Sequence, residues 1–315
     1  MRQKVLIKPS PKFKFPKAFV YIVSFLCLIC TSTSTFGSDI EDCNSACSDR
    51  LFTINVVGSG QPVLLIPGLM SSSSVYDMLI SKLSQHFEFH IVSVKGFAGI
   101  PQYGEFSLDK LVEDLKAYIE SEKLFRPHVV GHSMGGLTAL TMAAEHSRLI
   151  GKVVSIDGLP FIGPIFTRNN HTTVAMLEQQ AQTIKAMFEN MTGEQMASQT
   201  QQQIYLQATS LAHQAMIVDM AKRSDPRTVG AAMFDVMTTD LREQLKASST
   251  AILMLGASGA FTQKEQHEQV KSLYEEQFEN VANSTVIMNA TTRHFMMLDD
   301  VDWVSQKVKQ FLSEE

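Results

Sequence analysis

A serine near the middle of the chain stands in a sequence that restricts how the chain can fold. Residues 131–135 read Gly-His-Ser-Met-Gly, which is a G-x-S-x-G pattern. Residues 128–130 before it predict a short buried strand, and residues 134–146 after it predict a helix. Small residues on both sides of Ser133 let the two elements meet at a sharp turn. The pattern therefore predicts a strand–turn–helix unit with a strained serine at the turn.

The chain around this unit alternates between predicted strands and predicted helices. We expect strands at 51–57, 63–66, 88–94, 128–130, 152–156, 251–255 and 285–288. We expect helices at 71–87, 107–124, 134–146, 263–279 and 301–312. This alternation favours an α/β fold, in which helices cover both faces of a mostly parallel twisted sheet.

Residues 159–248 interrupt the alternation, because they contain no convincing strand pattern. They are rich in Gln and Met, and the spacing of Met176, Ile184 and Met187 is typical of amphipathic helices. We expect a helical cap here, inserted into a core formed by 51–158 and 249–315. The methionines are expected to fill the core of this insertion, although a Met-rich layer also accommodates varied apolar ligands.

The first 37 residues follow the order of charged and apolar residues that is typical of a secretory signal peptide. Six basic residues and no acidic one precede a 13-residue apolar run at 18–30, and small and polar residues follow it. The run is shorter than the roughly 20 residues of a membrane-spanning helix. We expect a signal peptide at 1–37, cleaved near Gly37, and an N-terminal arm at 38–50 in a periplasmic or secreted protein. The alternative is a membrane anchor through an uncleaved N-terminal segment.

The charge and cysteine content of the mature chain narrow the choice of partners. Removal of 1–37 takes away six of the 27 basic residues and none of the 32 acidic ones, so the net charge changes from −5 to −11. Such a chain has no electrostatic footprint for nucleic acid and no attraction to an anionic membrane.

After removal of 1–37, the cysteines that remain are Cys43 and Cys47, and either a small disulfide loop or two free thiols is compatible with their spacing. Two cysteines without a nearby His make no metal site, and we expect no metal and no cofactor.

Two further segments support chemistry at Ser133. A predicted strand runs into Pro67-Gly68-Leu69, where a loop can face the serine, so that the backbone N–H groups of Leu69 and Met134 would stabilise an oxyanion. His294 follows the last predicted strand and precedes the last helix, a combination of position and context that the other eight histidines lack, and an imidazole is the side chain that most often serves as a general base. His132, within the motif itself, is expected to serve in packing or to support the catalytic residues from behind.

These motifs together resemble the α/β-hydrolase superfamily over 51–313. The resemblance is carried by GHSMGG, by the PGL loop and by the late RHF, and the helical insertion matches the place of the family's cap. The segments PGLMSSSSVYD, VKGFAGIP and DGLPFIG resemble more narrowly a branch of exported bacterial α/β hydrolases, which implies no substrate. The superfamily resemblance implies the fold, Ser133 as nucleophile, His294 as base, and Leu69 and Met134 as the oxyanion hole.

The acid of the expected triad is where the chain departs from the usual pattern of the family. The loop after the strand at 251–255 reads GASGAF and has no carboxylate before Glu265. Some members carry the acid after the preceding strand, and Asp157 stands there, at the carboxyl end of 152–156. We expect Asp157 to orient His294, with Glu265 as the alternative. Asp299 and Asp300 are expected to serve the N-terminus of the last helix.

The functional expectation is a serine hydrolase that cleaves a carboxylic ester, or a related acyl substrate, through an acyl-enzyme. Phe97, Phe161 and Phe166 are expected to line an apolar acyl pocket, so the partner would be a small apolar or amphiphilic acyl compound. The same residues can also perform acyl transfer, lactone opening or peroxidase chemistry. The alternative from another class is an inactive exported binding protein on the same scaffold, which the missing acid at the usual position would explain.

Overall fold

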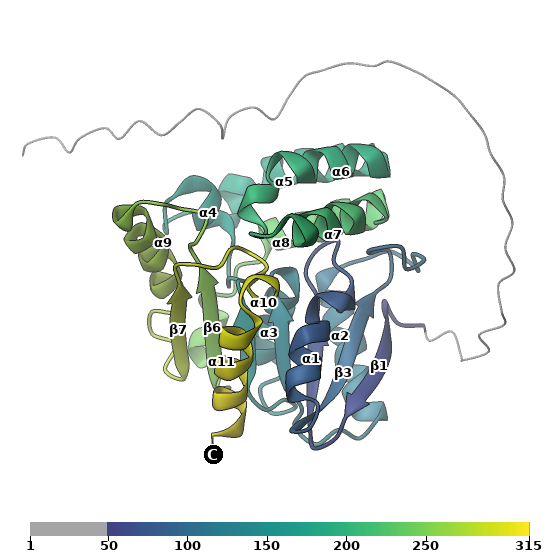
Figure 1. Cartoon of the computed structure of the whole chain (residues 1–315), viewed down its shortest axis with the longest axis vertical. Coiled ribbons are helices and arrows are strands. Elements are labelled where there is room, and N and C mark those ends of the chain that lie inside the picture. Colours follow the sequence, from purple (N-terminus) through teal and green to yellow (C-terminus); the bar gives the residue numbers. More distant parts are fainter. Residues whose placement is uncertain (1–48, 315) are drawn as a thin grey trace, which may run out of the picture. The chain divides into compact units, whose positions relative to one another are not determined.

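The computed structural model describes residues 49–314. The expected signal peptide at 1–37, the cysteines Cys43 and Cys47, and the arm up to residue 48 therefore lie outside the described residues. The described part is an α/β structure built on one seven-stranded sheet (Figure 1).

The sheet is parallel except at one edge. Its strands are β1 (Phe52–Gly58), β2 (Gln61–Ile66), β3 (Phe87–Val94), β4 (His128–His132), β5 (Val153–Ile156), β6 (Ile252–Ala257) and β7 (Ser284–Asn289). Their order is β1-β3-β2-β4-β5-β6-β7, and only β1 runs antiparallel, against β3. The order reverses around β2 and β4, so the carboxyl ends of the central strands form the crevice where α/β proteins bind ligands.

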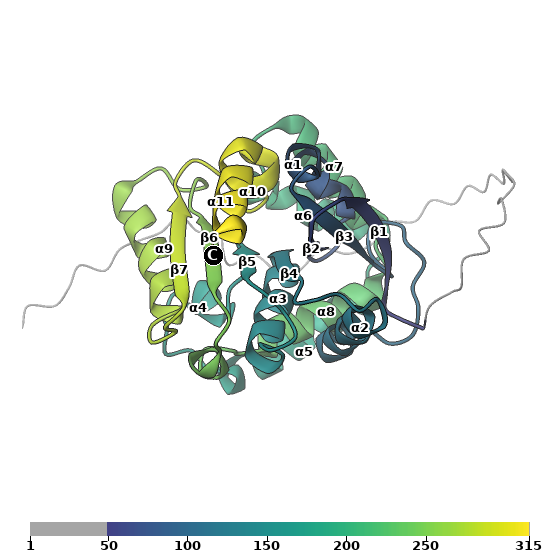
Figure 2. The ribbon, with the colours of Figure 1, turned by 90° about the horizontal axis from the view of Figure 1, so that it is seen from below.

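Helices cover both faces of this sheet, as Figure 2 shows from below. On one face lie the 3-10 helix η2 (Ser73–Tyr76) and the helices α1 (Asp77–Leu83), α10 (Met296–Asp299) and α11 (Val301–Ser313). On the other face lie α2 (Leu108–Ser121), α3 (Met134–Glu145) and α9 (Lys264–Gln277). The expected α/β fold class is confirmed.

The central strands are buried on both faces, and this explains their continuous apolar sequences. In β2, Val63 and Leu65 belong to the hydrophobic cluster under α1 and α11, whereas Leu64 and Ile66 belong to the cluster under α2 and α3. All four side chains are fully buried. Alternate side chains of one strand thus fill two separate cores, which a strand in a parallel sheet requires.

Only helical elements connect β5 to β6. They are α4 (Gly163–Thr167), α5 (Val174–Glu189), α6 (Gly193–Gln202), η3 (Ile204–Leu206), α7 (Leu211–Lys222), α8 (Pro226–Thr238) and η4 (Gln244–Ala247). Helix α5 packs along α8 and α6 packs along α7, and the four lie together above the sheet in Figure 1. We refer to residues 159–248 as the cap. Between residues 49 and 314, no helix is both long enough and apolar enough to cross a membrane.

One expected helix differs from the structure. The sequence predicts a single helix over 71–87, but the chain forms the short η2 and then α1, which ends at Leu83. The Ser72 hydroxyl accepts a hydrogen bond from the backbone N–H of Ser74. Serine side chains compete for backbone groups in this way and favour caps over helix interiors, so the run of serines delays the helix.

Candidate active site

Ser133 occupies the turn between β4 and α3 in a strained backbone conformation. Its φ is 54° and its ψ is −118°, a region that non-glycine residues rarely adopt. Two hydrogen bonds hold the turn: the Ser133 N–H donates to the Ile156 carbonyl at 2.9 Å, and the Leu137 N–H donates to the Ser133 carbonyl at 3.0 Å. The turn thus fixes the serine at the carboxyl edge of the sheet and at the N-terminus of a helix.

Two glycines of the motif explain why this segment folds into so tight a turn. A Cβ atom on Gly131 would collide with the backbone of Gly135, and a Cβ atom on Gly135 would collide with the carbonyl of Ile66 in β2. Because both obstacles are backbone atoms, no side-chain rearrangement could relieve them. Glycine at both positions therefore permits α3 to start directly against β4 and β2.

The loop after β2 lies against the serine. A Cβ atom on Gly68 would stand 3.1 Å from the Ser133 Cβ and 2.9 Å from the His132 Nδ1. Leu69 follows in this loop, and Met134 is the first residue of α3, whose N–H has no acceptor within the helix. The two expected oxyanion donors thus belong to segments that meet at Ser133, and their role stays a prediction.

His294 and Asp157 are brought together from positions 137 residues apart. His294 stands in the loop between β7 and α10, and Asp157 directly follows β5 with a φ of 52°. The imidazole Nδ1 lies 2.6 Å from the Asp157 Oδ2, and the carboxylate side chain is 8% exposed. Since a carboxylate accepts hydrogen bonds, the proton is assigned to Nδ1, and Nε2 is left as the basic nitrogen. Glu265, the alternative acid, is exposed in the first turn of α9.

The second oxygen of Asp157 is held by two donors that sequence reasoning missed. Its Oδ1 accepts the Ala257 N–H at 2.8 Å and the Tyr274 hydroxyl at 2.9 Å. Tyr274 belongs to α9, and burial raises the pKa of its phenol well above the ordinary value, so the hydroxyl remains a donor. Ala257 is the last residue of β6, next to the loop where the resemblance leads us to look for the acid, and its backbone N–H holds Asp157, which follows the neighbouring strand β5. A buried Tyr in an amphipathic helix gives no sequence signal that separates this role from packing.

His132 supports the backbone of His294. It is fully buried, and its Nε2–H donates to the His294 carbonyl at 3.0 Å. Its ring lies 4.6 Å from the ring of His294 and 4.5 Å from that of Phe295. Burial, and then the charge of His294, hold the pKa of His132 well below its ordinary value, so the ring is neutral. The packing role expected for His132 therefore includes a direct hydrogen bond to the loop that carries His294.

The three phenylalanines expected in an acyl pocket have different surroundings. Phe97 is fully buried and packs against Phe106, with the ring centroids 6.0 Å apart. Phe161 is also fully buried, and the guanidinium of Arg242 lies 4.9 Å from its ring centroid. Phe166 lies in α4 and is 40% exposed. Their place in a substrate pocket stays a prediction.

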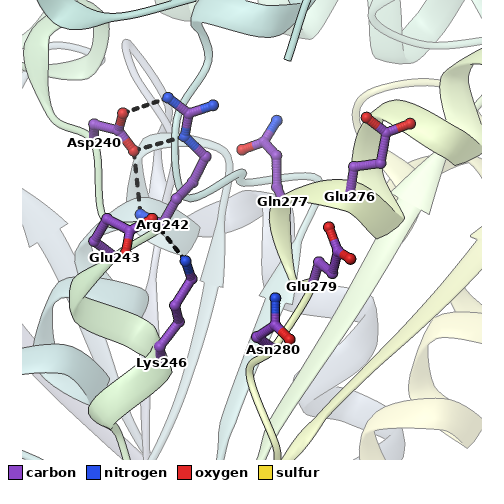
Figure 3. Close-up of a pocket in the computed structure, with 8 residues that line it drawn as sticks. All are labelled: Asp240, Arg242, Glu243, Lys246, Glu276, Gln277, Glu279 and Asn280. Atoms are coloured by element: carbon purple, nitrogen blue, oxygen red, sulfur yellow. Dashed lines mark hydrogen bonds and ion pairs between the residues drawn. The ribbon is translucent and has the colours of Figure 1, made fainter. Parts of the chain in front are cut away.

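A pocket of about 270 Å³ opens elsewhere, between the end of the cap and the end of α9 (Figure 3). Its lining residues are Asp240, Arg242, Glu243, Lys246, Glu276, Gln277, Glu279 and Asn280. Arg242 pairs with Asp240 at 2.6 Å and Lys246 pairs with Glu243 at 2.7 Å, as the dashed lines in Figure 3 show. This charged lining is unsuited to an apolar acyl group. Within residues 49–314, no group of three or more His, Cys, Asp or Glu side chains is arranged to hold a metal ion.

Comparison with known proteins relates the chain as a whole to one family. A family model described as the alpha/beta hydrolase fold matches residues 61–301. A pimeloyl-[acyl-carrier protein] methyl ester esterase of Vibrio cholerae is 30% identical over 105 residues, which is 33% of this chain and 40% of that relative. The corresponding esterase of Vibrio atlanticus is 26% identical over 215 residues, which is 66% of this chain and 79% of that relative. The chain thus matches about 40% of the length of the first of these relatives and more of the second.

Solved structures show the same fold at low sequence identity. The enol-lactonase from Burkholderia xenovorans LB400 superposes with a TM-score of 0.66 at 19% identity, over 84% of this chain and 96% of that one. A thermophilic esterase from Thermogutta terrifontis superposes with a TM-score of 0.67 at 16% identity, over 83% and 92%. Identities this low are evidence for the fold and for nothing finer.

Proposed function

Because this chain belongs to the α/β-hydrolase family, we propose that it is a serine hydrolase that cleaves a carboxylic ester or a related acyl compound. The observation that carries the proposal is the 2.6 Å hydrogen bond between the His294 Nδ1 and the Asp157 Oδ2. It occurs at the same edge of the sheet as the strained turn at Ser133. A nucleophile, a base and a group that orients the base are the parts that acyl transfer requires.

In the proposed reaction, the Ser133 Oγ attacks the carbonyl carbon of the substrate while the His294 Nε2 takes the hydroxyl proton. The negative charge that develops on the carbonyl oxygen is stabilised by the backbone N–H groups of Met134 and Leu69. His294 then returns the proton to the departing alcohol, which leaves an acyl group on Ser133. Water, activated by His294, hydrolyses this acyl-enzyme and releases the acid.

Asp157 would keep His294 in the tautomer with the proton on Nδ1 and stabilise the imidazolium that forms in each step. Its second oxygen is occupied by Ala257 and Tyr274, so the carboxylate has one oxygen directed to the histidine. The absence of a carboxylate after β6 is the feature that favours an inactive binding protein. Asp157, which follows the neighbouring strand β5, is hydrogen-bonded to His294, and this supports the hydrolase over the binding protein.

For the substrate, we propose an acyl group that is apolar, held between the Ser133 turn and the cap. Phe97, Phe161 and Phe166 are the proposed pocket residues, with methionines of the cap as an adaptable layer. The relatives named as methyl ester esterases and the structure named as an enol-lactonase act on ester-type bonds according to those names. We further propose that the enzyme acts outside the cytoplasm, after cleavage of residues 1–37.

The first experiment is labelling with a fluorophosphonate probe. We expect the wild-type protein to be labelled and Ser133→Ala to be unlabelled, because only a serine activated by a base reacts rapidly with such a probe. Hydrolysis of p-nitrophenyl esters with short and long acyl chains then measures the size of the pocket. A folded wild-type protein that is neither labelled nor active on any ester would contradict the proposal and favour the binding protein.

A second experiment tests the acid. Asp157→Asn should reduce kcat by about 10³–10⁴-fold, because the amide favours the wrong histidine tautomer. Glu265→Gln is the matched control, since it removes the charge of the alternative acid, and it should retain wild-type turnover. If Asp157→Asn keeps near wild-type turnover, the assignment of Asp157 as the acid is wrong, and a loss of activity in Glu265→Gln would move that role to Glu265.

A further inference from the structure

A short segment of the cap lies directly against the loop that carries His294. We call residues 206–209 the cap tether and residues 293–295 the histidine loop. The His294 N–H donates to the Leu206 carbonyl at 3.2 Å, and the Phe295 N–H donates to the Gln207 carbonyl at 2.8 Å. These backbone bonds join parts of the chain that are more than 80 residues apart.

Side chains reinforce the same contact. The Arg293 Nη1 donates to the Ala208 carbonyl at 2.9 Å. Ile204 and Ala208 are buried in one hydrophobic cluster with Phe295, Met296 and Met297. Figure 1 shows α10, which follows the histidine loop, beneath the cap helices. This end of the cap therefore shares a core with the elements around His294 and packs against them.

Asp299 connects the two segments with a single carboxylate. Its Oδ1 accepts both the N–H and the hydroxyl of Thr209, each at 2.8 Å, and its Oδ2 accepts the Arg293 N–H at 2.8 Å. The sequence predicts that Asp299 and Asp300 both serve the last helix. In the structure Asp300 does so, because its side chain accepts the N–H of Trp303 at 3.0 Å, whereas Asp299 bridges the cap tether and the histidine loop.

His294 is restrained at three points, and one of them belongs to the cap. Its imidazole is held by Asp157, its carbonyl by His132, and its N–H by Leu206. The first two partners stand at the ends of core strands, but the position of Leu206 depends on the cap tether. The location of the His294 Nε2 relative to Ser133 thus depends in part on where the cap lies.

We propose that Asp299 is a positioning residue, which ties the cap tether to the histidine loop and thereby keeps His294 aligned with Ser133. The proposal rests on the proposed function, because it requires His294 to be the base. It assigns to the cap a second role besides covering the substrate: a displaced tether misaligns the base. A misplacement of about 1 Å at a reacting group can cost about 10²-fold in rate, so a partial loosening should be measurable.

The kinetic test uses a graded series of variants with short p-nitrophenyl esters as substrates. Asp299→Ala removes all three bonds and should reduce kcat about tenfold, with KM within about twofold of wild type. Thr209→Val removes one bond from the cap side and should reduce kcat about threefold. Thr209→Ser keeps both donors and should restore the wild-type kcat.

Asp300→Ala is the matched control for loss of stability. It removes a neighbouring carboxylate that caps α11 and contacts neither the cap tether nor His294 through a hydrogen bond. It should lower Tm, because N-cap removal destabilises helices, and leave kcat unchanged. If Asp299→Ala and Asp300→Ala reduce kcat equally at equal loss of Tm, or if Thr209→Ser fails to restore kcat, Asp299 has a structural role only.

Hydrogen exchange provides a readout that does not require activity. In Asp299→Ala, amides in 204–210 and in 291–296 should exchange faster together, while Asp300→Ala should change neither segment. Faster exchange in only one segment, or in none, would overturn the link between cap and loop. Absence of fluorophosphonate labelling at Ser133 in the wild type would instead contradict the proposed function, and the exchange result would still decide whether Asp299 joins the two segments.

Discussion

At the scale of single residues, the carboxylate of Asp157 is held by several donors at once. Three hydrogen bonds reach its two oxygens, from His294, Ala257 and Tyr274. Only the bond from His294 belongs to the proposed reaction. The other two fix the rotamer of the carboxylate, so that the oxygen facing His294 is the one with no competing partner.

Removal of the Tyr274 hydroxyl should therefore slow the reaction without weakening substrate binding. We expect Tyr274→Phe to reduce kcat about threefold to tenfold with little change in KM, because the Asp157 carboxylate gains rotational freedom. Tyr118→Phe is the matched control. Tyr118 is also buried, and its hydroxyl lies 2.6 Å from the His90 Nδ1, in a hydrogen bond that does not involve the Ser133 site.

Both substitutions remove one buried hydrogen bond, which is worth about 1 kcal/mol of the free energy of unfolding. Urea unfolding should thus show similar losses for the two variants, while steady-state kinetics should separate them. Equal kcat values in Tyr274→Phe and the wild type would show that the Ala257 N–H alone is sufficient to orient Asp157.

At the scale of secondary-structure elements, the turn between β4 and α3 depends on close backbone approach. Gly135→Ala should destabilise the protein by more than about 3 kcal/mol or prevent its soluble expression, because the new Cβ would collide with the carbonyl of Ile66. Gly104→Ala is the control. Gly104 has a φ of 64° and no heavy atom within 4 Å of an added Cβ, so only the backbone strain of about 1 kcal/mol applies. Thermal unfolding of both variants measures the difference. Equal Tm values would show that the backbone near Gly135 and Ile66 can move apart without a loss of stability.

The elements that could be predicted from the sequence are those with a strong local pattern. The buried strands and the helices at α2, α3 and α11 follow from apolar runs and from 3.6-residue spacing, and the fold class follows from their alternation. The start of α1 could not be predicted as well, because the serines at 71–74 form caps only in their actual backbone conformation.

The parts of the candidate site that could be predicted are those next to elements with a strong local pattern. Ser133 and His294 stand next to elements with clear patterns, and Asp157 stands at the end of a predicted strand, so their proximity follows from the order of parallel strands. Tyr274 and Asp299 could not be identified as partners. Their roles arise from tertiary contacts with segments about 90 or more residues away, which no periodicity in the chain reports.

At the scale of the whole molecule, histidines that are held neutral by full or partial burial couple folding to pH. His132 is one of them, and His128 at the start of β4 is another. The His128 Nδ1 accepts the Lys152 N–H at 2.9 Å, so a proton on this nitrogen would break the bond. Burial, followed by the charges of Lys152 and Arg126, lowers the pKa of His128 to about 4.

The direction of the pH effect follows from this lowered pKa. An unfolded histidine has a pKa of about 6.5, so below that pH the unfolded chain binds a proton that folded His128 excludes. The stabilisation is complete above about pH 6.5 and is lost as the pH falls toward 4. One such group contributes a slope of at most about 1.4 kcal/mol per pH unit, and less for His128, which is only partly buried.

His128→Asn should therefore flatten the dependence of unfolding free energy on pH between 6.5 and 4. The asparagine Oδ1 can accept the Lys152 N–H as the imidazole Nδ1 does, but it cannot take up a proton in this range. The same substitution at the exposed His171 is the control for loss of a histidine. Urea unfolding of the three proteins at several pH values measures the slopes. If His128→Asn keeps the wild-type slope, the acid sensitivity of this fold does not come from His128 at the start of β4, and the buried His132 becomes the group to examine.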